Sequence, residues 1–507
     1  MRKLVDQPSH KAEHSPLLRS EKHESAIRQV SGSARYVDDI PAPASLCYAS
    51  VGVTNVASGT LTSLDLSAVK QSPGVIDVIT ISDIPGHTDI GPVFGGDPIL
   101  LDKEVKFHGQ PVFAVLAETQ EQARVAATKA TMTFAEAEAI LTTDEALAAD
   151  AKVRPTHEFG RGDVSNTLQS APLTASGHLS VGGQEHMYLE GQVSLAIPEE
   201  EDRISIFTSS QHPSEVQKLV AEVLDVKLHR VAVDMRRMGG GFGGKESQAA
   251  QWACLAAVFA LRTRRAVKMR LPRMMDMQVT GKRHPFENDY EIAFNESGKM
   301  LGAKVTVSGN CGHSPDLSDA IVDRAMFHVD NAYQLGDTHV TGHRLKTNIV
   351  SHTAFRGFGG PQGLIMAELL MDVVARKTGL DPLSVRKLNL YGQENGTVTP
   401  YGMPLEQDIL ADLIGKLEAD SNYWQRREEV KAFNAASPII KKGLALTPVK
   451  FGISFTAKHL NQAGALLHIY TDGSIQVNHG GTEMGQGLHT KIGQIVAHEF
   501  GVTLDNI

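Results

Sequence analysis

The feature that most constrains the fold is a run of glycines between a predicted strand and a predicted helix. Residues 238–246 read MGGGFGGKE, with five glycines in six consecutive positions. A residue without a Cβ atom lets a ligand or a second loop approach the main chain, and a helix N-terminus carries partial positive charge. The β-rich run HRVAVDM (229–235) precedes the glycines, and the apolar stretch SQAAQWACLAAVFALRTR (247–264) follows them. The loop is therefore expected at the entrance to a buried helix.

Two further glycine-rich turns stand ahead of predicted helices. RGFGG (356–360) leads into PQGLIMAELLMDVVARKTG (361–379), which opens on Pro and closes on Gly, the usual signals for the two ends of a helix. GGTEMGQG (480–487) follows two strand-like runs and leads into the amphipathic LHTKIGQIVAHEF. Tight packing of a turn explains one such loop. Three in one chain favour a single large anionic ligand held by bare main-chain N–H groups.

The glycine spacing in 239–244 also fits a dinucleotide fingerprint, and with Lys245 it fits a P-loop up to the last position. A P-loop needs a hydroxyl after the lysine to hold magnesium, whereas Glu246 would put a carboxylate beside the phosphates. A dinucleotide site needs an acidic residue about 20 positions further on. Pro272 and Arg273 follow the next strand instead, so both nucleotide sites are disfavoured.

Length and composition limit the class of protein. A chain of 507 residues predicts about three domains, and 41% hydrophobic with 21% charged residues is typical of a globular protein. The net charge of -9 disfavours nucleic acid as a partner. No apolar run of 18 residues and no secretory leader pattern occurs, so we expect no membrane contact and a cytoplasmic location.

The three cysteines, Cys47, Cys254 and Cys311, are too widely separated for a metal-binding pair or an iron–sulfur cluster. Any redox metal must therefore arrive inside a cofactor or on another subunit.

The order of predicted strands, helices and turns divides the chain into five segments and indicates an α+β fold class. We expect a polar arm at 1–25, an α/β domain at 26–134, an Ala/Glu/Asp-rich linker at 135–163, a second domain at 164–420 and a third at 421–507. The chain stops at GVTLDNI, where another strand is expected to start. The last domain is therefore expected to be incomplete.

Four segments carry a family resemblance: MGGGFGGKE, NIVSHTAFRGFGGPQG (348–363), LSDAIVDRAMFH (317–328) and residues 451–491. Together they resemble the molybdenum-binding large subunit of bacterial xanthine dehydrogenase, in the xanthine oxidase and aldehyde oxidase family, apparently truncated at its C-terminus. The resemblance implies an N-terminal hammerhead α/β domain followed by two molybdopterin-binding α+β domains. It also implies a molybdopterin-type molybdenum cofactor whose metal has no protein side chain as a direct ligand.

The resemblance assigns cofactor contacts to five residues. Gln211 and the main chain at Phe242 and Gly243 would lie near the oxo and hydroxyl ligands of the metal, while Arg356 and Gln486 would bind the pterin. Outside the motif, Gln211 would be interpreted as a polar residue at the start of a helix.

Five residues are expected at the substrate. Glu246 resembles a carboxylate that bonds ring nitrogens and passes a proton, and Arg324 resembles a guanidinium that stabilises negative charge on a purine ring. Phe358 and Phe455 resemble two aromatic rings that hold a flat heterocycle between them, and Thr456 would offer a hydroxyl. The structural alternative is a Glu246–Arg324 ion pair and ordinary core phenylalanines. A Glu/Arg pair favours hypoxanthine and xanthine as substrates over aldehydes.

The family's catalytic base, a glutamate in a Gly-x-Gly-Glu-Pro run, has no counterpart here, and Glu483 belongs to a different motif. We therefore expect little hydroxylase activity from this chain alone. The resemblance implies a hetero-oligomer with a subunit carrying 2Fe-2S clusters and FAD, and a chaperone that inserts the cofactor. The alternatives are an aldehyde or N-heterocycle hydroxylase of the same family and a catalytically inactive truncated subunit.

Overall fold

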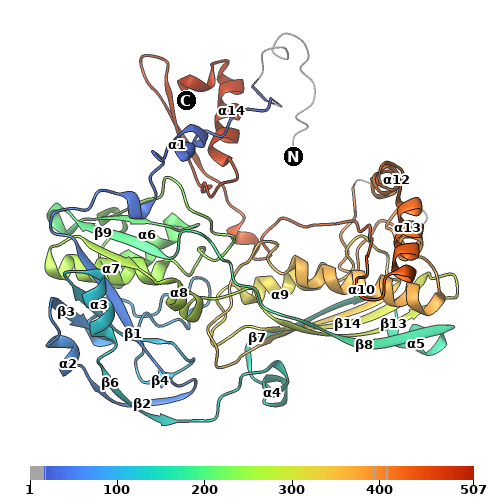
Figure 1. The fold of residues 1–507 in the computed structure, drawn as a ribbon, viewed down its shortest axis with the longest axis horizontal. Coiled ribbons are helices and arrows are strands. Elements are labelled where there is room, and N and C mark those ends of the chain that lie inside the picture. The colour runs from blue at the N-terminus through green and yellow to red at the C-terminus, as the bar shows by residue number, and fades with distance from the viewer. Residues whose placement is uncertain (1–15, 18, 393–394, 407–408) are drawn as a thin grey trace.

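The computed structural model describes residues 16–17, 19–392, 395–406 and 409–507, and its fold is α+β (Figure 1). Residues 1–15 of the expected polar arm lie outside the described part of the chain. One sheet joins strands from the expected first and second domains. Its order is β11 (Val231–Asp234), β10 (Ile204–Thr208), β9 (Val193–Pro198), β12 (Val267–Arg270), β1 (Cys47–Val53), β5 (Pro111–Ala117) and β3 (Val75–Ile79). The two segments therefore share one hydrophobic core.

A second sheet carries the other large core. Its order is β7 (Lys152–Arg161), β15 (Asp337–Leu345), β14 (Met300–Asn310), β13 (Phe286–Phe294) and β8 (Leu173–Val181). Helices α9 (Ser318–Met326) and α10 (Gly360–Thr378) pack on one face of it, as Figure 1 shows. A smaller sheet has the order β4 (Glu104–Val105), β2 (Gly59–Asp65) and β6 (Thr131–Glu136).

The helices beside the glycine loops form as the sequence predicts. Helix α6 (Pro213–Leu224) starts on Pro213 and buries one apolar face, while α7 (Ala250–Thr263) is buried nearly all round and packs against β9. Helix α10 ends at Gly379, whose φ of 73° is the left-handed conformation that suits glycine at a helix end. The other helices are α1 (Ala26–Val30), α2 (Ser67–Lys70), α3 (Gln120–Ala127), α4 (Thr143–Ala148), α5 (Val164–Ser170), α8 (Arg273–Val279), α11 (Pro382–Asn389), α12 (Leu410–Asp420) and α13 (Tyr423–Ala436).

The segment 135–163, expected as a linker, differs from that expectation. It contains α4 and the ten-residue strand β7, which pairs antiparallel with β15. Strand β7 lies at the edge of its sheet, where Pro155 is tolerated and where partial exposure permits a polar composition. The remaining boundaries, 26–134, 164–420 and 421–507, stay predictions.

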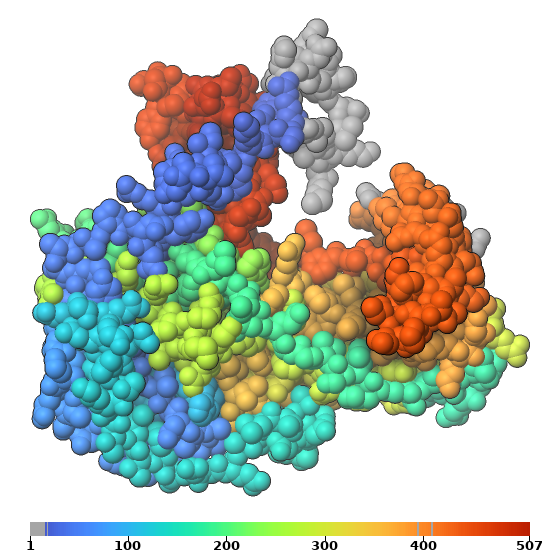
Figure 2. Space-filling view, viewed as in Figure 1, coloured from blue at the N-terminus to red at the C-terminus, as the bar shows by residue number. Residues whose placement is uncertain are grey.

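The C-terminal part is a small unit beside the N-terminal segment. The hairpin of β16 (Ala465–Ile469) and β17 (Ile475–His479) is followed by α14 (Leu488–Phe500). Figure 2 shows this unit (red) against the N-terminal segment (blue) at the top of the molecule. His23 Nε2 lies 3.3 Å from Glu483 Oε1, and the Glu24 N–H donates to Thr490 Oγ1 over 2.9 Å. Residues 460 or more positions apart therefore meet beside the third glycine loop.

Within the described residues, no helix is long and apolar enough to cross a membrane.

A buried charge network fixes α9 against the five-stranded sheet. Arg344 on β15 has a fully buried side chain, and its Nε lies 3.1 Å from Asp319 Oδ1 on α9. The same guanidinium also pairs with Asp323, which lies 2.8 Å from His157 Nδ1. Since α9 also carries Arg324, this network sets the position of a predicted substrate residue.

We predict that Arg344→Met destabilises the protein by about 3–5 kcal/mol, because it removes the buried cation that pairs with Asp319 and Asp323. The free energy of urea-induced unfolding measures the loss. The control is Arg124→Met, which removes an exposed ion pair with Glu121 and should cost less than about 1 kcal/mol. Equal losses in the two variants would contradict the role given to Arg344.

Candidate functional site

The first glycine loop follows β11 and adopts backbone conformations that few residues tolerate. Gly240 and Gly243 have φ of 95° and 101°, and Phe242 between them has φ of 55°. A non-glycine residue in this region costs about 1–3 kcal/mol and persists where its surroundings over-determine it. A Cβ atom at Gly243 would lie 2.6 Å from the Ala354 carbonyl oxygen, so only glycine fits there. The first loop therefore rests directly on the main chain that leads into the second.

The side chains of Gln211 and Lys245 hold this loop in place. The side-chain oxygen of Gln211 accepts hydrogen bonds from the N–H groups of Gly243, at 2.8 Å, and Lys245, at 3.3 Å. Lys245 is fully buried and donates to the Glu190 carbonyl and the Ser209 hydroxyl. Burial lowers the pKa of Lys245 to about 8. This lysine is therefore a structural donor, which removes the P-loop interpretation.

Main-chain hydrogen bonds join the three glycine loops. The Arg356 N–H donates to the Phe242 carbonyl over 2.8 Å, and the Met238 N–H donates to the Glu483 carbonyl over 2.9 Å. A cavity of about 310 Å³ opens at this junction and is lined by Gly239, Gly240 and Gly485 among others. Hydrogen bonds thus join the three loops, and the first and third of them line one cavity.

The main chain at this cavity offers free donors. Within the described part of the chain, the N–H groups of Gly240, Gly241 and Phe242 have no acceptor. Consecutive N–H groups of this kind in a turn form a concave site for an anion. The loop therefore fits a large anionic cofactor held by its main chain.

The third loop is organised by a buried carboxylate. Glu483 is 1% exposed, and its Oε1 accepts from the N–H groups of Gly485 at 2.8 Å and Gly487 at 3.1 Å. Gln486, expected at the pterin, uses its amide within the turn, where it bonds the Met484 N–H and the Thr482 carbonyl. These two bonds hold its side chain within the turn.

A second cluster forms where residues 451–456 cross α9. The Arg324 guanidinium donates to the carbonyls of Gly452 and Ser454 and lies 5.5 Å from the Phe358 ring centroid and 5.3 Å from that of Phe451. Its Nε has no partner within the described residues, and burial lowers the pKa of the group. Thr456 donates to the Ala320 carbonyl over 3.3 Å. Arg324 and Thr456 thus share one cluster with the two phenylalanines predicted at the substrate.

The two aromatic rings differ from the expected arrangement. The Phe358 and Phe455 centroids are 5.1 Å apart with their planes at 50°, so the rings contact each other. A flat ring held between them would need roughly 7 Å, twice an ordinary carbon contact. The bonds from Arg324 to Gly452 and Ser454 draw this segment, and Phe455 with it, onto Phe358. The rings would therefore have to separate to admit a heterocycle.

Glu246 is half-buried and, among the described residues, has no ion pair. Burial raises its pKa to about 7; His212 opposes this shift and Glu215 adds to it. The alternative of a structural Glu246–Arg324 ion pair is therefore not what the structure contains. A carboxyl group with a pKa near 7 suits proton transfer at neutral pH.

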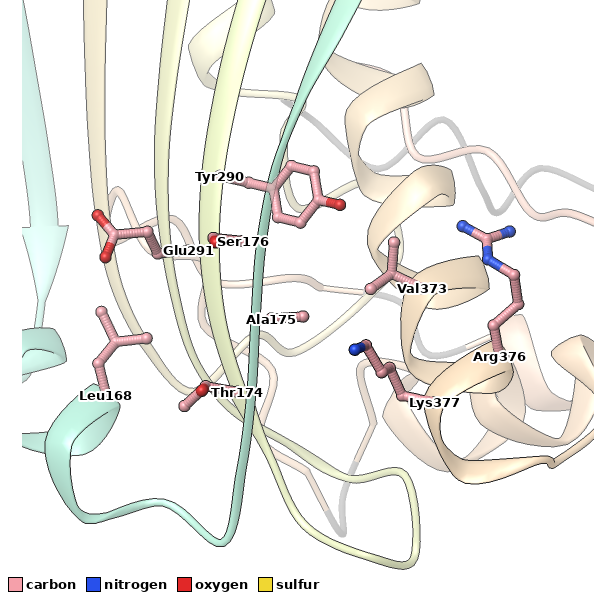
Figure 3. A pocket seen from close by; sticks show the side chains of 9 residues that line it. All are labelled: Leu168, Thr174, Ala175, Ser176, Tyr290, Glu291, Val373, Arg376 and Lys377. Carbon is pink, nitrogen blue, oxygen red and sulfur yellow. The ribbon is translucent and has the colours of Figure 1, made fainter.

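A larger cavity lies elsewhere. Figure 3 shows this hollow of about 770 Å³ between β8, β13 and the end of α10, lined by Tyr290, Glu291, Arg376 and Lys377 among others. It contains none of the predicted site residues. Size alone therefore does not locate the site.

Comparison with known proteins shows the family of this chain. The family model for the aldehyde oxidase and xanthine dehydrogenase a/b hammerhead domain matches residues 31–138, and two models for molybdopterin cofactor-binding domains match 148–390 and 416–507. The chain therefore belongs to the xanthine oxidase and aldehyde oxidase family of molybdopterin-binding oxidoreductases.

Relatives with this similarity are longer proteins. The chain is 39% identical over 486 residues to xanthine dehydrogenase/oxidase of Gallus gallus, and 39% identical over 508 residues to xanthine dehydrogenase of Calliphora vicina. These matches cover 96% and 99% of this chain but only 36% and 37% of the relatives.

Solved structures share the fold. The aldehyde oxidoreductase from Desulfovibrio gigas superposes with a TM-score of 0.82 at 26% identity, over 96% of this chain and 55% of that one. Quinoline 2-oxidoreductase from Pseudomonas putida 86 has a TM-score of 0.84 at 21% identity, over 96% and 65%.

Some residues of the site could not be predicted from the sequence. Glu190 accepts from the Gly239 N–H at 2.8 Å, and His186 Nε2 donates to the Ala354 carbonyl over 2.7 Å while its ring stacks on Phe355. Neither stands in a glycine motif. Their only sequence signal is a charged or polar residue within the run QEHMYLEGQ (184–192), which does not reveal its partners.

The pKa of Glu246 leads to a prediction for stability. Between its ordinary pKa of 4.5 and about 7, the folded protein holds a proton that the unfolded chain has released, so this residue lowers stability as the pH rises. Glu246→Gln should match wild type near pH 4.5 and exceed it by up to about 3 kcal/mol at pH 8. Urea unfolding at both pH values measures the difference. A constant difference at both pH values would contradict the burial assigned to this carboxyl group.

Proposed function

We propose that this chain forms the molybdenum-cofactor-binding part of a purine hydroxylase, which oxidises hypoxanthine and xanthine to urate with an oxygen atom from water. The observation that carries the proposal is the joining of three glycine loops by main-chain hydrogen bonds, beside a cavity and free main-chain donors. The relatives named above are xanthine dehydrogenases, which favours purines as the substrate class.

Five residues would hold the cofactor. The main chain of Phe242 and Gly243, braced by Gln211, would face the metal end, and Arg356 and Gln486 would contact the pterin. The cofactor, when bound, supplies a two-electron redox centre. The protein contributes orientation and a main-chain anion site, with no side chain as a direct metal ligand.

Two charged residues would act on the substrate. Glu246 would bond a ring nitrogen and hold or release a proton there, a role to which a pKa of about 7 is suited. Arg324 would place its guanidinium at a purine carbonyl oxygen and stabilise negative charge on the ring. Phe358 and Phe455 would cover the faces of the purine, and Thr456 would offer its hydroxyl. In this role Arg324 would exchange its bonds to Gly452 and Ser454 for bonds to the substrate.

Electrons taken from the substrate need an acceptor. The three cysteines are buried, and no group of three or more potential metal ligands occurs among the described residues. We therefore propose a cytoplasmic hetero-oligomer with a subunit carrying 2Fe-2S clusters and FAD, loaded by an insertion chaperone. The 507 residues contain no Gly-x-Gly-Glu-Pro run, so we expect this chain alone to turn over little substrate.

Metal analysis tests cofactor binding. Purified from cells that make the cofactor, the chain should retain molybdenum in proportion to protein, and Gly243→Ala should lose most of it because the added Cβ meets the Ala354 carbonyl. Gly415→Ala on α12, where a Cβ meets nothing within 4 Å, is the matched control and should retain the metal. Circular dichroism verifies that each variant is folded. A folded wild-type chain without molybdenum would favour an inactive, binding-only protein.

Substrate preference tests the role of Arg324. In the complete enzyme, Arg324→Met should lower kcat/KM for xanthine by about 10²–10³-fold, the usual effect of removing a group that stabilises transition-state charge. Turnover of benzaldehyde should change little, because it lacks the ring carbonyl. Arg203→Met, at an exposed position, is the control. A wild-type enzyme that prefers benzaldehyde would support the aldehyde hydroxylase alternative.

A further inference from the structure

Arg237 is a buried arginine without a carboxylate partner among the described residues. It directly precedes the first glycine loop and is 7% exposed. Its Nη1 donates to the Arg35 carbonyl over 3.1 Å and its Nη2 to the Ser25 hydroxyl over 3.2 Å, while its buried Nε has no partner in the described chain. Burying a cation in this way is costly unless a counter-charge is present at some stage of function.

Arg237 stands between two cavities. With Tyr36 it lines both the 310 Å³ cavity at the glycine loops and a second cavity of about 470 Å³. The second cavity is also lined by Arg28, Arg35 and Arg236. Four arginines therefore line one hollow that adjoins the first and third glycine loops.

The acidic groups nearby do not balance these cations. Arg236 lies 3.5 Å from Glu24, whose charge also acts on Arg237 without a direct ion pair, and Asp234 lines the same cavity. Arg28 and Arg35 are exposed, and neither has an ion pair with any described residue. The planar fork of a guanidinium matches phosphate oxygens in pairs, so several arginines around a cavity suit phosphate better than a single carboxylate.

We propose that the cavity formed by Arg28, Arg35, Arg236 and Arg237 is a binding site for a phosphate or pyrophosphate group. Two sources would present the same chemistry: a phosphate-bearing end of the cofactor that reaches past Arg237, or a separate soluble phosphate-bearing anion. The first source rests on the proposed function, and the second does not. In either case the buried Arg237 binds the anion at the inner end of the cavity, and the exposed Arg28 and Arg35 bind it from the solvent side.

Calorimetric titration of the cofactor-free 507-residue chain with pyrophosphate tests the site. We expect saturable binding that weakens about ten-fold in Arg35→Gln and in Arg28→Gln, because each variant loses one charged hydrogen-bond donor. Arg124→Gln, in an exposed ion pair on α3, is the matched control and should bind as wild type does. Since Arg237→Gln could impair folding, the two exposed arginines decide the result. Absence of saturable binding, or equal affinity in wild type and both variants, would overturn the proposal.

Repeating the titration with molybdenum-loaded protein separates the two sources. If the cofactor supplies the phosphate, loading abolishes pyrophosphate binding, and Arg35→Gln retains less molybdenum than Arg124→Gln. If the anion is separate, pyrophosphate binds the loaded protein with unchanged affinity. A chain that binds pyrophosphate but never molybdenum would contradict the proposed function and leave this site standing.

Discussion

The site depends on contact between main chains at the glycine loops. Gly243 lies so close to Ala354 that any side chain would collide with its carbonyl oxygen, and the Arg356 N–H bonds the Phe242 carbonyl beside that contact. Such contacts fix two loops to within a fraction of an ångström without any side chain to move. A ligand that bonds these N–H groups therefore meets donors already in position, which lowers the entropy lost on binding.

Backbone strain marks the same places. Phe242 and Phe358 each stand inside a glycine run with a positive φ, of 55° and 49°. The flanking glycines adopt the positive φ angles that these sharp turns require. The turns place each ring where a loop of ordinary backbone conformation would not. Phe358 contacts Phe455 and lies beside Arg324, so strain in the second loop positions an aromatic ring in the cluster proposed to bind the substrate. Residues 354–358 therefore link the region proposed for the cofactor to the region proposed for the substrate.

Much of this organisation follows from local sequence, and some of it does not. Helices near the glycine loops were predictable from Pro or Gly at their ends and from apolar periodicity, as at 213–224 before the first loop and 360–378 after the second. Strand β7 was not predicted, because an edge strand buries few side chains and its sequence can therefore be polar. The partners of Glu190, Arg237 and Glu483 could not be predicted either, because each is defined by chain segments far away in sequence.

The most direct test of the central claim is hydrogen–deuterium exchange of the three loops, 238–244, 354–358 and 483–487, with and without bound molybdenum cofactor. If these loops form one main-chain site, the cofactor should slow amide exchange in all three together, most strongly at Gly240, Gly241 and Phe242, whose N–H groups have no acceptor among the described residues. Protection confined to one loop, or absent from 238–244, would contradict the account.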